Sequence, residues 1–244
     1  MAKTEPVSVV LVALGGYGHF YLNALLDDPR GKRARIVGAV DPLAERCGRL
    51  DDLKEMGVPL YDTLDEFYGA GHEAELAVIS SPIQWHCPQV CKALENGTNV
   101  LCEKPLGATI QEAARMAVAR DEAGKFVAIG YQWSFSEAIQ RLKSDIMDGR
   151  YGTPRQLKSL VLWPRDHAYY NRNSWAGAVQ DDNGRWVLDS PVNNAVAHYL
   201  HNMFYVLGPE TDRSAMPASV QGERYRANDI ENYDTATLRA LTSE

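Results

Sequence analysis

"VALGGYGHFY", residues 12–21, joins the end of an apolar run to the start of a helical pattern. On the dinucleotide-binding fingerprint, Ala13, Gly15 and Gly18 take the three glycine positions, and Gly16 is additional. Glycines in such a turn let the backbone approach a pyrophosphate, and the N-terminus of the following helix offers unpaired N–H groups. The residues expected to contact a nucleotide here are Gly15, Gly16, Tyr17 and Gly18.

Short apolar runs alternate with helical patterns over the first 130 residues. The expected strands are residues 7–13, 34–41, 74–81, 99–103 and 125–131. The expected helices are residues 17–28, 42–57, 85–97 and 109–124. Apolar strands that alternate with helices are typical of a parallel sheet covered on both faces. We therefore expect an α/β fold, with a doubly wound parallel Rossmann sheet that forms an NAD-binding domain over residues 1–128.

The pattern changes after about residue 130. Further along the chain we expect a connecting helix at 136–152, a longer strand at 155–164, a helix at 193–208 and a strand at 233–244. Residues 165–186 predict a long polar and aromatic loop, and loops of this length in compact domains are usually functional or disordered. Residues 129–244 are thus expected to form an α+β domain with a mostly antiparallel sheet, for substrate binding and dimerisation.

The composition argues against several classes of partner. The net charge of −7 comes from 25 basic and 32 acidic residues, which disfavours binding to nucleic acid or to an anionic membrane. The N-terminus lacks the features of a signal peptide, and no apolar run approaches membrane-spanning length, so a cytoplasmic location is expected. Cys87 and Cys91 share a helix face, but no second pair has zinc spacing, which favours reduced thiols and predicts no metal site.

Asp41 follows the second expected strand, twenty-three positions after Gly18. This offset is close to that of the acid that binds a ribose 2′-hydroxyl in dinucleotide-binding domains. The alternative is that Asp41 caps the helix that begins at Pro42, and both roles are compatible. Because an acid repels a 2′-phosphate, the sequence favours NAD over NADP.

"NVLCEKPLGA", residues 99–108, is a strand that stops at Glu103 and Lys104. In open α/β sheets, ligands bind outside the carboxyl ends of the strands. Pro105 restricts Lys104 to an extended conformation, and a cis peptide bond is compatible with this position. The pattern indicates an amine directed to the crevice where a nicotinamide would lie, ready for proton transfer. The simpler alternative is a solvated strand end.

Four stretches together resemble the glucose–fructose oxidoreductase, inositol dehydrogenase and rhizopine-catabolism (Gfo/Idh/MocA) family. They are the glycine-rich turn, "SSPIQWH" (80–86), the Glu-Lys-Pro motif, and "GYQWSFSEAIQ" with "GRYGTPRQLKS" (130–140 and 149–159). The resemblance covers nearly the whole chain. It implies that Lys104 takes part in proton transfer. It also implies contacts with the cofactor from Ser81, Pro82, His86, Glu103 and Lys104.

Members of this family also carry an Asp and, four residues later, a His near the substrate, on a helix of the second domain. His198 matches the histidine, whereas Asn194 stands where the family usually has Asp. An amide can bind a substrate hydroxyl but cannot take its proton. His201 replaces another common Asp. Asp189 is an alternative carboxylate, but its position argues against a simple replacement.

The residues of this second region also allow an interpretation of their own. On a helix, Asn194, His198, His201 and Asn202 would form one polar stripe that needs partners. The alternative is that the stripe caps loops or meets the surface, and no third ligand supports a metal site at the two histidines. In the loop, Tyr170, Arg172 and Trp175 suit a sugar-like ligand through stacking and hydrogen bonds, although aromatic residues also pack under loops.

These observations lead to two hypotheses about function. The first is an NAD-dependent oxidoreductase that transfers a hydride between a sugar, polyol or related hydroxy compound and the nicotinamide, with Lys104, His198 and Asn194 as catalytic residues. The second is a ligand-sensing or regulatory protein on the same fold, which Asn194 and His201 favour. Family members run beyond this length, so the second domain is expected to be incomplete relative to them. A homodimer or homotetramer is expected through its sheet.

Overall fold

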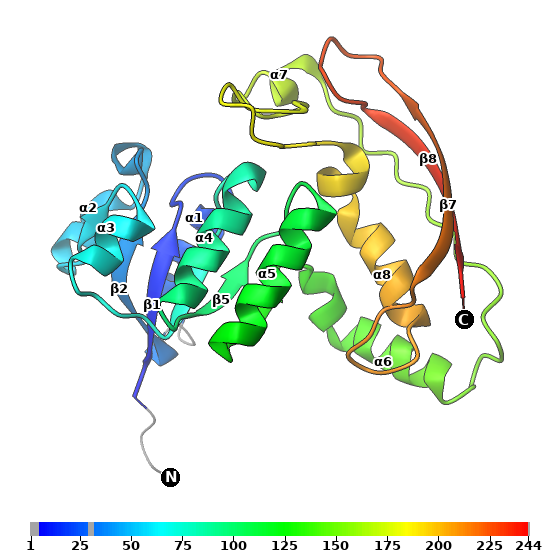
Figure 1. The fold of residues 1–244 in the computed structure, drawn as a ribbon, viewed down its shortest axis with the longest axis horizontal. Coiled ribbons are helices and arrows are strands. Elements are labelled where there is room, and N and C mark those ends of the chain that lie inside the picture. The colour runs from blue at the N-terminus through cyan, green and yellow to red at the C-terminus, as the bar shows by residue number, and fades with distance from the viewer. Residues whose placement is uncertain (1–4, 29–31, 244) are drawn as a thin grey trace. The chain divides into compact units, whose positions relative to one another are not determined.

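The chain folds into two units, Met1–Gly130 and Tyr131–Glu244 (Figure 1). The structure is a computed structural model that describes residues 5–28 and 32–243. The first unit is built on a parallel sheet, and the second combines helices with an antiparallel strand pair. In the part of the chain that the structure describes, no helix has the length and apolar character needed to cross a membrane.

The first unit contains a six-stranded, fully parallel sheet. Its strands are β1 (Val7–Val12), β2 (Ala34–Val40), β3 (Leu60–Tyr61), β4 (Leu76–Ile79), β5 (Asn99–Cys102) and β6 (Val127–Ile129). They lie in the order β3-β2-β1-β4-β5-β6. The order reverses between β1 and β4, which is the point where open α/β sheets bind ligands. The expected α/β fold with a doubly wound parallel sheet is confirmed.

Helices cover both faces of this sheet. They are α1 (Gly18–Asp27), α2 (Leu50–Glu55), α3 (Leu64–Gly69), α4 (Ile83–Glu95) and α5 (Ile110–Ala123), with a short 3-10 turn, η2 (Ala44–Arg46). Alternate residues of β1 point to opposite faces, so Val10 and Val12 pack with α3, α4 and α5, whereas Val9 and Leu11 pack with α1 and α2. Both faces of β1 are therefore buried, as its continuous apolar run predicts.

Capping residues fix several helix ends in this unit. Thr109 and Glu112 form a capping box at the start of α5, and Gly124 ends that helix with a φ of 62°. The expected single helix over residues 42–57 is wrong, because the backbone is extended at Cys47 and separates η2 from α2. Strand β3 and helix α3 were not expected, although Thr63 accepts the capping hydrogen bond from the Glu66 N–H.

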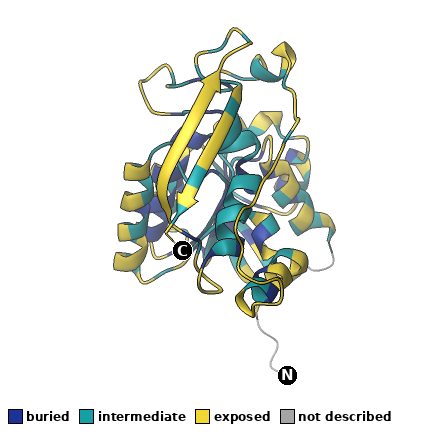
Figure 2. Ribbon diagram, turned by 90° about the vertical axis from the view of Figure 1, so that its right-hand side faces the viewer, coloured by how far each residue is buried: buried dark blue, intermediate teal, exposed yellow. Residues whose placement is uncertain are grey.

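The second unit contains helices and two strands. Its elements are η3 (Gln132–Phe135), α6 (Glu137–Met147), α7 (His167–Tyr170), η4 (Pro191–Ala195), α8 (Ala197–Leu207), β7 (Pro217–Tyr225) and β8 (Thr235–Thr242). Helices α6 and α8 pack against each other, and β7 pairs with β8 in antiparallel register. Among the described strands, these two pair only with each other. Figure 2 shows that β7 is exposed along its length and β8 over most of it.

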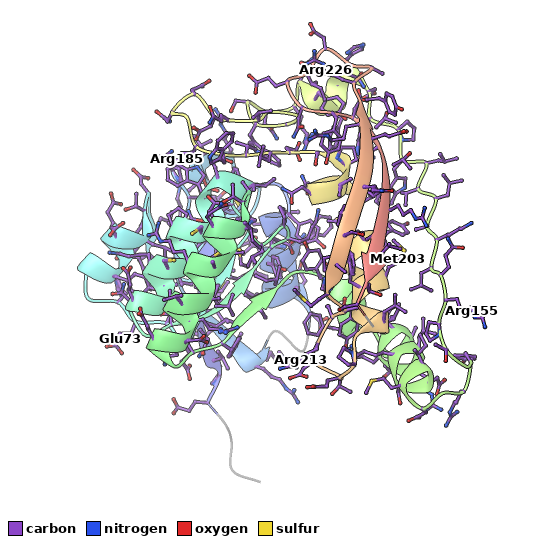
Figure 3. All side chains as sticks on the ribbon, turned by 45° about the vertical axis from the view of Figure 1, so that its right-hand side comes forward. Glu73, Arg155, Arg185, Met203, Arg213 and Arg226 are labelled. Carbon is purple, nitrogen blue, oxygen red and sulfur yellow. The ribbon has the colours of Figure 1, made fainter. Side chains whose placement is uncertain are left out.

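Two expectations for this unit are wrong. Residues 155–164 form no strand: Leu160 is 84% exposed, and Arg155 extends away from the neighbouring ribbon (Figure 3). An alternating sequence becomes a strand only beside another strand, and here no described strand pairs with it. The helix expected from residue 193 begins at Ala197, because Ser190 and Pro191 start a separate π-turn that ends before Val196. Asn194 is therefore not on α8.

Candidate functional site

The glycine loop after β1 is shaped for a close approach by a ligand. Gly16 has a φ of 54°, and Ala13, at the first glycine position, has a φ of 67°. A Cβ on Gly18 would lie 2.1 Å from the Ala13 carbonyl oxygen, so only glycine fits there. A Cβ on Gly15 would meet no protein atom within 4 Å. Gly18 is thus required by the protein itself, whereas Gly15 leaves open space above the loop.

The N-terminus of α1 follows this loop directly. Tyr17 at its N-cap makes no capping hydrogen bond with its side chain, and the first turn carries no acidic residue. The Tyr17 ring is 43% exposed and lies 5.1 Å from the ring of Phe20, between centroids. Backbone N–H groups and the positive end of the helix dipole at such a terminus bind phosphate groups.

Asp41 lies against the glycine loop. Its Oδ2 accepts a hydrogen bond from the Leu14 N–H at 2.8 Å, and its Oδ1 accepts one from the Leu43 N–H at 2.8 Å. The second bond closes the turn after β2. The helix that Asp41 was expected to cap at Pro42 is not formed, since the 3-10 turn η2 begins at Ala44 with Leu43 as its N-cap residue and has no side-chain cap. Each carboxylate oxygen has a further lone pair. The geometry therefore leaves capacity for a ribose hydroxyl beside the loop.

Glu103 is a buried carboxylate at the end of β5. Its Oε1 accepts a hydrogen bond from the Tyr21 hydroxyl at 2.6 Å, and its Oε2 accepts one from the Lys104 N–H at 3.1 Å. Burial raises the pKa of Glu103, and these two donors act in the opposite direction. A Cβ on Gly130 would lie 2.8 Å from Glu103 Oε1, so the glycine makes room for the carboxylate. Glu103 thereby connects α1 to the segment that carries Lys104.

His86 connects two loops at the carboxyl ends of β4 and β5. Its Nδ1 lies 2.7 Å from the Pro105 carbonyl oxygen, and its Nε2 lies 2.8 Å from that of Ser81. Burial lowers the pKa of His86, and the two carbonyl groups oppose this shift. A neutral imidazole donates to only one of them. Because both ring nitrogens face backbone oxygens, the imidazole of His86 bridges the loop that contains Ser81 and the loop that contains Pro105.

The segment from Ser81 to Pro105 places the other predicted residues of the first unit. Pro82 is the N-cap residue of α4, and the Ser81 hydroxyl donates to Gln89 Oε1 at 2.5 Å. Lys104 is half-buried, and the peptide bond between Lys104 and Pro105 is cis. Lys104 thus follows the buried Glu103 directly and precedes the proline that His86 contacts.

In the second unit, Asn194 is bound to a carboxylate. Its Nδ2 donates to Asp189 Oδ1 at 2.7 Å, and Asp189 Oδ2 accepts from the Gly177 N–H at 2.8 Å. Asp189 was expected only as an alternative carboxylate, and its hydrogen bond to Asn194 was not predicted, because the turn between them brings the two side chains together. Tyr21 in the first unit was missed for the same kind of reason, since it contacts Glu103 across 82 positions of the chain.

The two histidines of α8 are packed between aromatic rings. His198 is buried, and its ring stacks on Trp133 with 4.8 Å between centroids. His201 stacks on Tyr131 with 4.1 Å between centroids, and burial lowers its pKa. His201 also lines a cavity of about 420 Å³ within this unit. Other residues that line this cavity are Leu200, Phe204, Ala215 and Tyr233.

The predicted sugar-binding residues of the loop do not line this cavity. The Arg172 guanidinium lies 3.5 Å from the ring centroid of Tyr169 and 5.3 Å from that of Trp175. Its Nη1 also donates to the Tyr169 carbonyl at 2.6 Å. Tyr170 and Trp175 are half-buried beside it. Arg172 is thus held by neighbouring aromatic rings, an arrangement that leaves the sugar-binding role a prediction.

The first unit fits a dinucleotide. It combines open space above Gly15, a helix N-terminus without a side-chain cap and Asp41 beside the loop, all at the point where the strand order reverses. Within the described residues, no three His, Cys, Asp or Glu side chains cluster as a metal ion would require. The unit is therefore a Rossmann domain of the NAD-binding class.

The family follows from a match over the same residues. Residues 7–131 of the 244 match the family model described as an oxidoreductase family with an NAD-binding Rossmann fold, GFO_IDH_MocA. The chain belongs to this Gfo/Idh/MocA family. The resemblance that the Glu-Lys-Pro motif and the glycine turn indicated is confirmed.

Several characterised proteins are similar to this chain. The rhizopine catabolism protein MocA of Rhizobium meliloti is 30% identical over 197 residues, which are 77% of this chain and 59% of that protein. An inositol 2-dehydrogenase of Burkholderia cenocepacia (strain HI2424) is 25% identical over 211 residues, which are 84% of this chain and 55% of that protein. The chain thus spans somewhat more than half the length of these relatives.

A solved structure shows the same fold. The WlbA dehydrogenase of Bordetella pertussis, in complex with NADH and UDP-GlcNAcA, superposes with a TM-score of 0.82 over 98% of this chain and 64% of that one. The two sequences are 24% identical. At this level of identity the likeness supports the fold of the chain.

Proposed function

We propose that this protein is an NAD-dependent oxidoreductase that acts on a sugar, a polyol or a related hydroxy compound. The observation that carries the proposal is the position of Lys104, which follows the buried Glu103 at the carboxyl end of β5. Tyr21 and His86 hold the residues on either side of it. Membership of the oxidoreductase family and the similarity to inositol 2-dehydrogenases support the same proposal.

The proposed roles follow from the chemistry of each side chain. Bound NAD supplies a nicotinamide that exchanges a hydride with the substrate. Lys104 takes the proton of the substrate hydroxyl on its Nζ and returns it in the reverse direction. In the second unit, His198 assists this proton transfer and Asn194 binds a substrate hydroxyl. Tyr170, Arg172, Trp175 and His201 are proposed to contact the substrate.

Asp41 supports NAD over NADP as the cofactor. Its carboxylate lies beside the glycine loop, where its charge would repel a 2′-phosphate and its oxygens would accept hydrogen bonds from a ribose. Ser81, Pro82 and Glu103 are proposed to contribute to cofactor binding through the loops they belong to. Comparison of the Kd values for NAD and NADP tests this part, and a tighter Kd for NADP would contradict it.

The test of the activity is a substrate panel. The protein is incubated with NAD and with inositols, sugars and linear polyols, and the absorbance of NADH is followed. Turnover of at least one compound is expected. Replacement of Lys104 by Ala should lower kcat by about 10²- to 10⁴-fold, because general acid–base catalysis contributes this much. The Kd for NAD, measured by calorimetry, should change little.

The exposed Lys54 provides the control, since Lys54→Ala removes an amine from the same unit. Wild-type turnover is expected for that variant. Unchanged turnover in Lys104→Ala would remove the proposed catalytic role.

The alternative is a ligand-sensing or regulatory protein that binds the nucleotide without catalysis. Asn194 favours it, because an amide cannot take a proton. The same panel decides between the two, since a sensor would bind NAD and a polyol without producing NADH.

We also propose a homodimer or homotetramer that uses the β7–β8 sheet. Val220 and Leu241 expose apolar side chains on its two strands, and each strand has one edge without a partner among the described strands. A monomeric mass in light scattering would contradict this proposal.

A further inference from the structure

A buried carboxylate stands next to the amide that replaces the family's Asp. Asp189 is 3% exposed, and its Oδ1 accepts the hydrogen bond from Asn194 Nδ2 at 2.7 Å. Its Oδ2 accepts from the Gly177 N–H at 2.8 Å. The site therefore still contains a carboxylate, but it belongs to Asp189, five positions before Asn194 in the chain.

The backbone holds Asp189 in this position at a conformational cost. Leu188 has a φ of 48°, a left-handed conformation that is unfavourable for leucine. The Val187 and Leu188 N–H groups both donate to the Val179 carbonyl, and the Asp189 N–H donates to that of Ala178. A strained residue of this kind persists where its surroundings hold it. The position of Asp189 is thus specified by the fold.

A third segment fixes the same point. Asn232 Nδ2 donates to the Asp189 carbonyl at 2.9 Å, and the Asn232 N–H donates to the Gly177 carbonyl at 2.9 Å. Asp189 is therefore hydrogen-bonded to Gly177 and Ala178, to Asn194 and to Asn232. Its side chain has little freedom to turn away from Asn194.

The chemistry of the pair determines how the amide is oriented. An ionised carboxylate only accepts hydrogen bonds, so Asn194 must turn its NH₂ group toward Asp189. Its carbonyl oxygen, Oδ1, then lies on the other branch of the amide. We propose that Asp189 is a positioning residue, which fixes the Asn194 amide so that its carbonyl oxygen accepts a substrate hydroxyl. This inference rests on the proposed function.

Single replacements should disturb the pair in different ways. In Asp189→Asn, the new amide keeps its oxygen on the Gly177 N–H and turns its NH₂ toward Asn194. Asn194 must then reverse and present a donor in place of an acceptor. In Asn194→Asp, two carboxylates face each other across 2.7 Å, which is unfavourable while both are ionised. The double variant Asp189→Asn/Asn194→Asp again has one amide and one carboxylate, with an acceptor oxygen presented as before.

The experiment measures kcat, KM and the unfolding midpoint for the four proteins, with a substrate found in the panel. Asp189→Asn should lower kcat/KM by about tenfold or more, because Asn194 then presents a donor where the substrate hydroxyl needs an acceptor. The midpoint should change less than in Asn194→Asp, because the new amide still pairs with both Gly177 and Asn194. Asn194→Asp should lower both kcat/KM and the midpoint. The double variant should recover both. The exposed Asp182 lies on the same loop, and Asp182→Asn should change neither.

The outcomes separate the two proposals. If wild-type protein turns over a substrate, and the double variant recovers its midpoint without recovering kcat/KM, the pair is structural and the positioning role is wrong. Wild-type kinetics in Asp189→Asn would also overturn it. If wild-type protein turns over no compound, the proposed function fails first, and the positioning role fails with it.

Discussion

The Tyr21 hydroxyl donates a hydrogen bond of 2.6 Å to Glu103 Oε1. This contact connects the helix that follows the glycine loop to the residue that precedes Lys104. The nucleotide-binding loop and the proposed proton-transfer residue are therefore parts of one hydrogen-bonded arrangement within the first unit. A substitution at Tyr21 should therefore alter the position of Lys104, because Glu103 is hydrogen-bonded to both residues.

Replacement of Tyr21 by Phe should destabilise the first unit. The buried Glu103 would lose a donor, which costs about 1–3 kcal/mol of unfolding free energy. Because the Tyr21 bond acts to lower the pKa of Glu103, its loss should raise that pKa further. The deficit should therefore shrink as the pH falls and Glu103 becomes protonated. Urea unfolding at several pH values measures it.

Tyr151 provides the control for this prediction. It is 68% exposed, and Tyr151→Phe should leave the unfolding free energy unchanged. A Tyr21→Phe variant as stable as wild type at neutral pH would show that the hydroxyl of Tyr21 contributes nothing to the arrangement.

Two glycines of the loop should respond differently to alanine. Gly18→Ala places a Cβ 2.1 Å from the Ala13 carbonyl oxygen, so the unfolding free energy should fall by about 2 kcal/mol or more. Gly15→Ala meets no protein atom within 4 Å and should keep its stability. It should still weaken NAD binding by about tenfold, because the methyl group occupies the space that a pyrophosphate would approach.

The comparison of the two variants tests the phosphate-binding role itself. Thermal unfolding gives the stability of each variant, and calorimetry gives its Kd for NAD. Equal Kd values for Gly15→Ala and wild type would mean that the ligand does not approach the loop at this glycine.

Much of the first unit follows from local sequence signals. The run at Val9–Val12 is apolar throughout and forms the part of β1 that is buried on both faces. Thr109 and Gly124 bound α5 as their types predict, because each makes its capping interaction within a few residues. These signals lie within a few residues of each other. Once the strands form a parallel sheet, their carboxyl ends meet at one edge, so the site residues that follow them are placed without any further sequence signal.

The second unit was harder to predict because its structure depends on distant contacts. The alternation in residues 155–164 indicates a strand, but the backbone has no neighbouring strand among the described residues. Asn194 left the expected helix because Ser190 caps a separate turn. The bond between Asp189 and Asn194 depends on that turn, and no periodic pattern encodes it.

Lys143 is a buried cation that joins α6 to the end of α8. Its Nζ donates to the Tyr205 carbonyl at 2.7 Å and to that of Arg213, and lies 4.1 Å from the ring centroid of Tyr205. Burial lowers the pKa of Lys143. Lys143→Met keeps the length of the side chain but removes the donors, and should lower the unfolding free energy by about 1–3 kcal/mol.

Chemical denaturation of Lys143→Met measures this effect, and Lys158→Met at an exposed position is the matched control. If Lys143→Met and Lys158→Met have equal midpoints, then the methylene packing that lysine and methionine have in common, and not the donated hydrogen bonds, accounts for the contribution of Lys143.

His201 should make the stability of the protein depend on pH. Burial lowers its pKa in the folded state, so below the ordinary value of about 6.5 the unfolded state binds more protons than the folded state. Stability should then fall as the pH decreases from about 7 to 5, with a slope of up to about 1.4 kcal/mol per pH unit for this one group.

His201→Phe keeps a ring to stack on Tyr131, which lies 4.1 Å away between centroids, but removes the titrating group. The variant should match wild type near neutral pH and lose less stability at pH 5. Equal slopes for His201→Phe and wild type would mean that the folded protein protonates His201 as readily as the unfolded chain does.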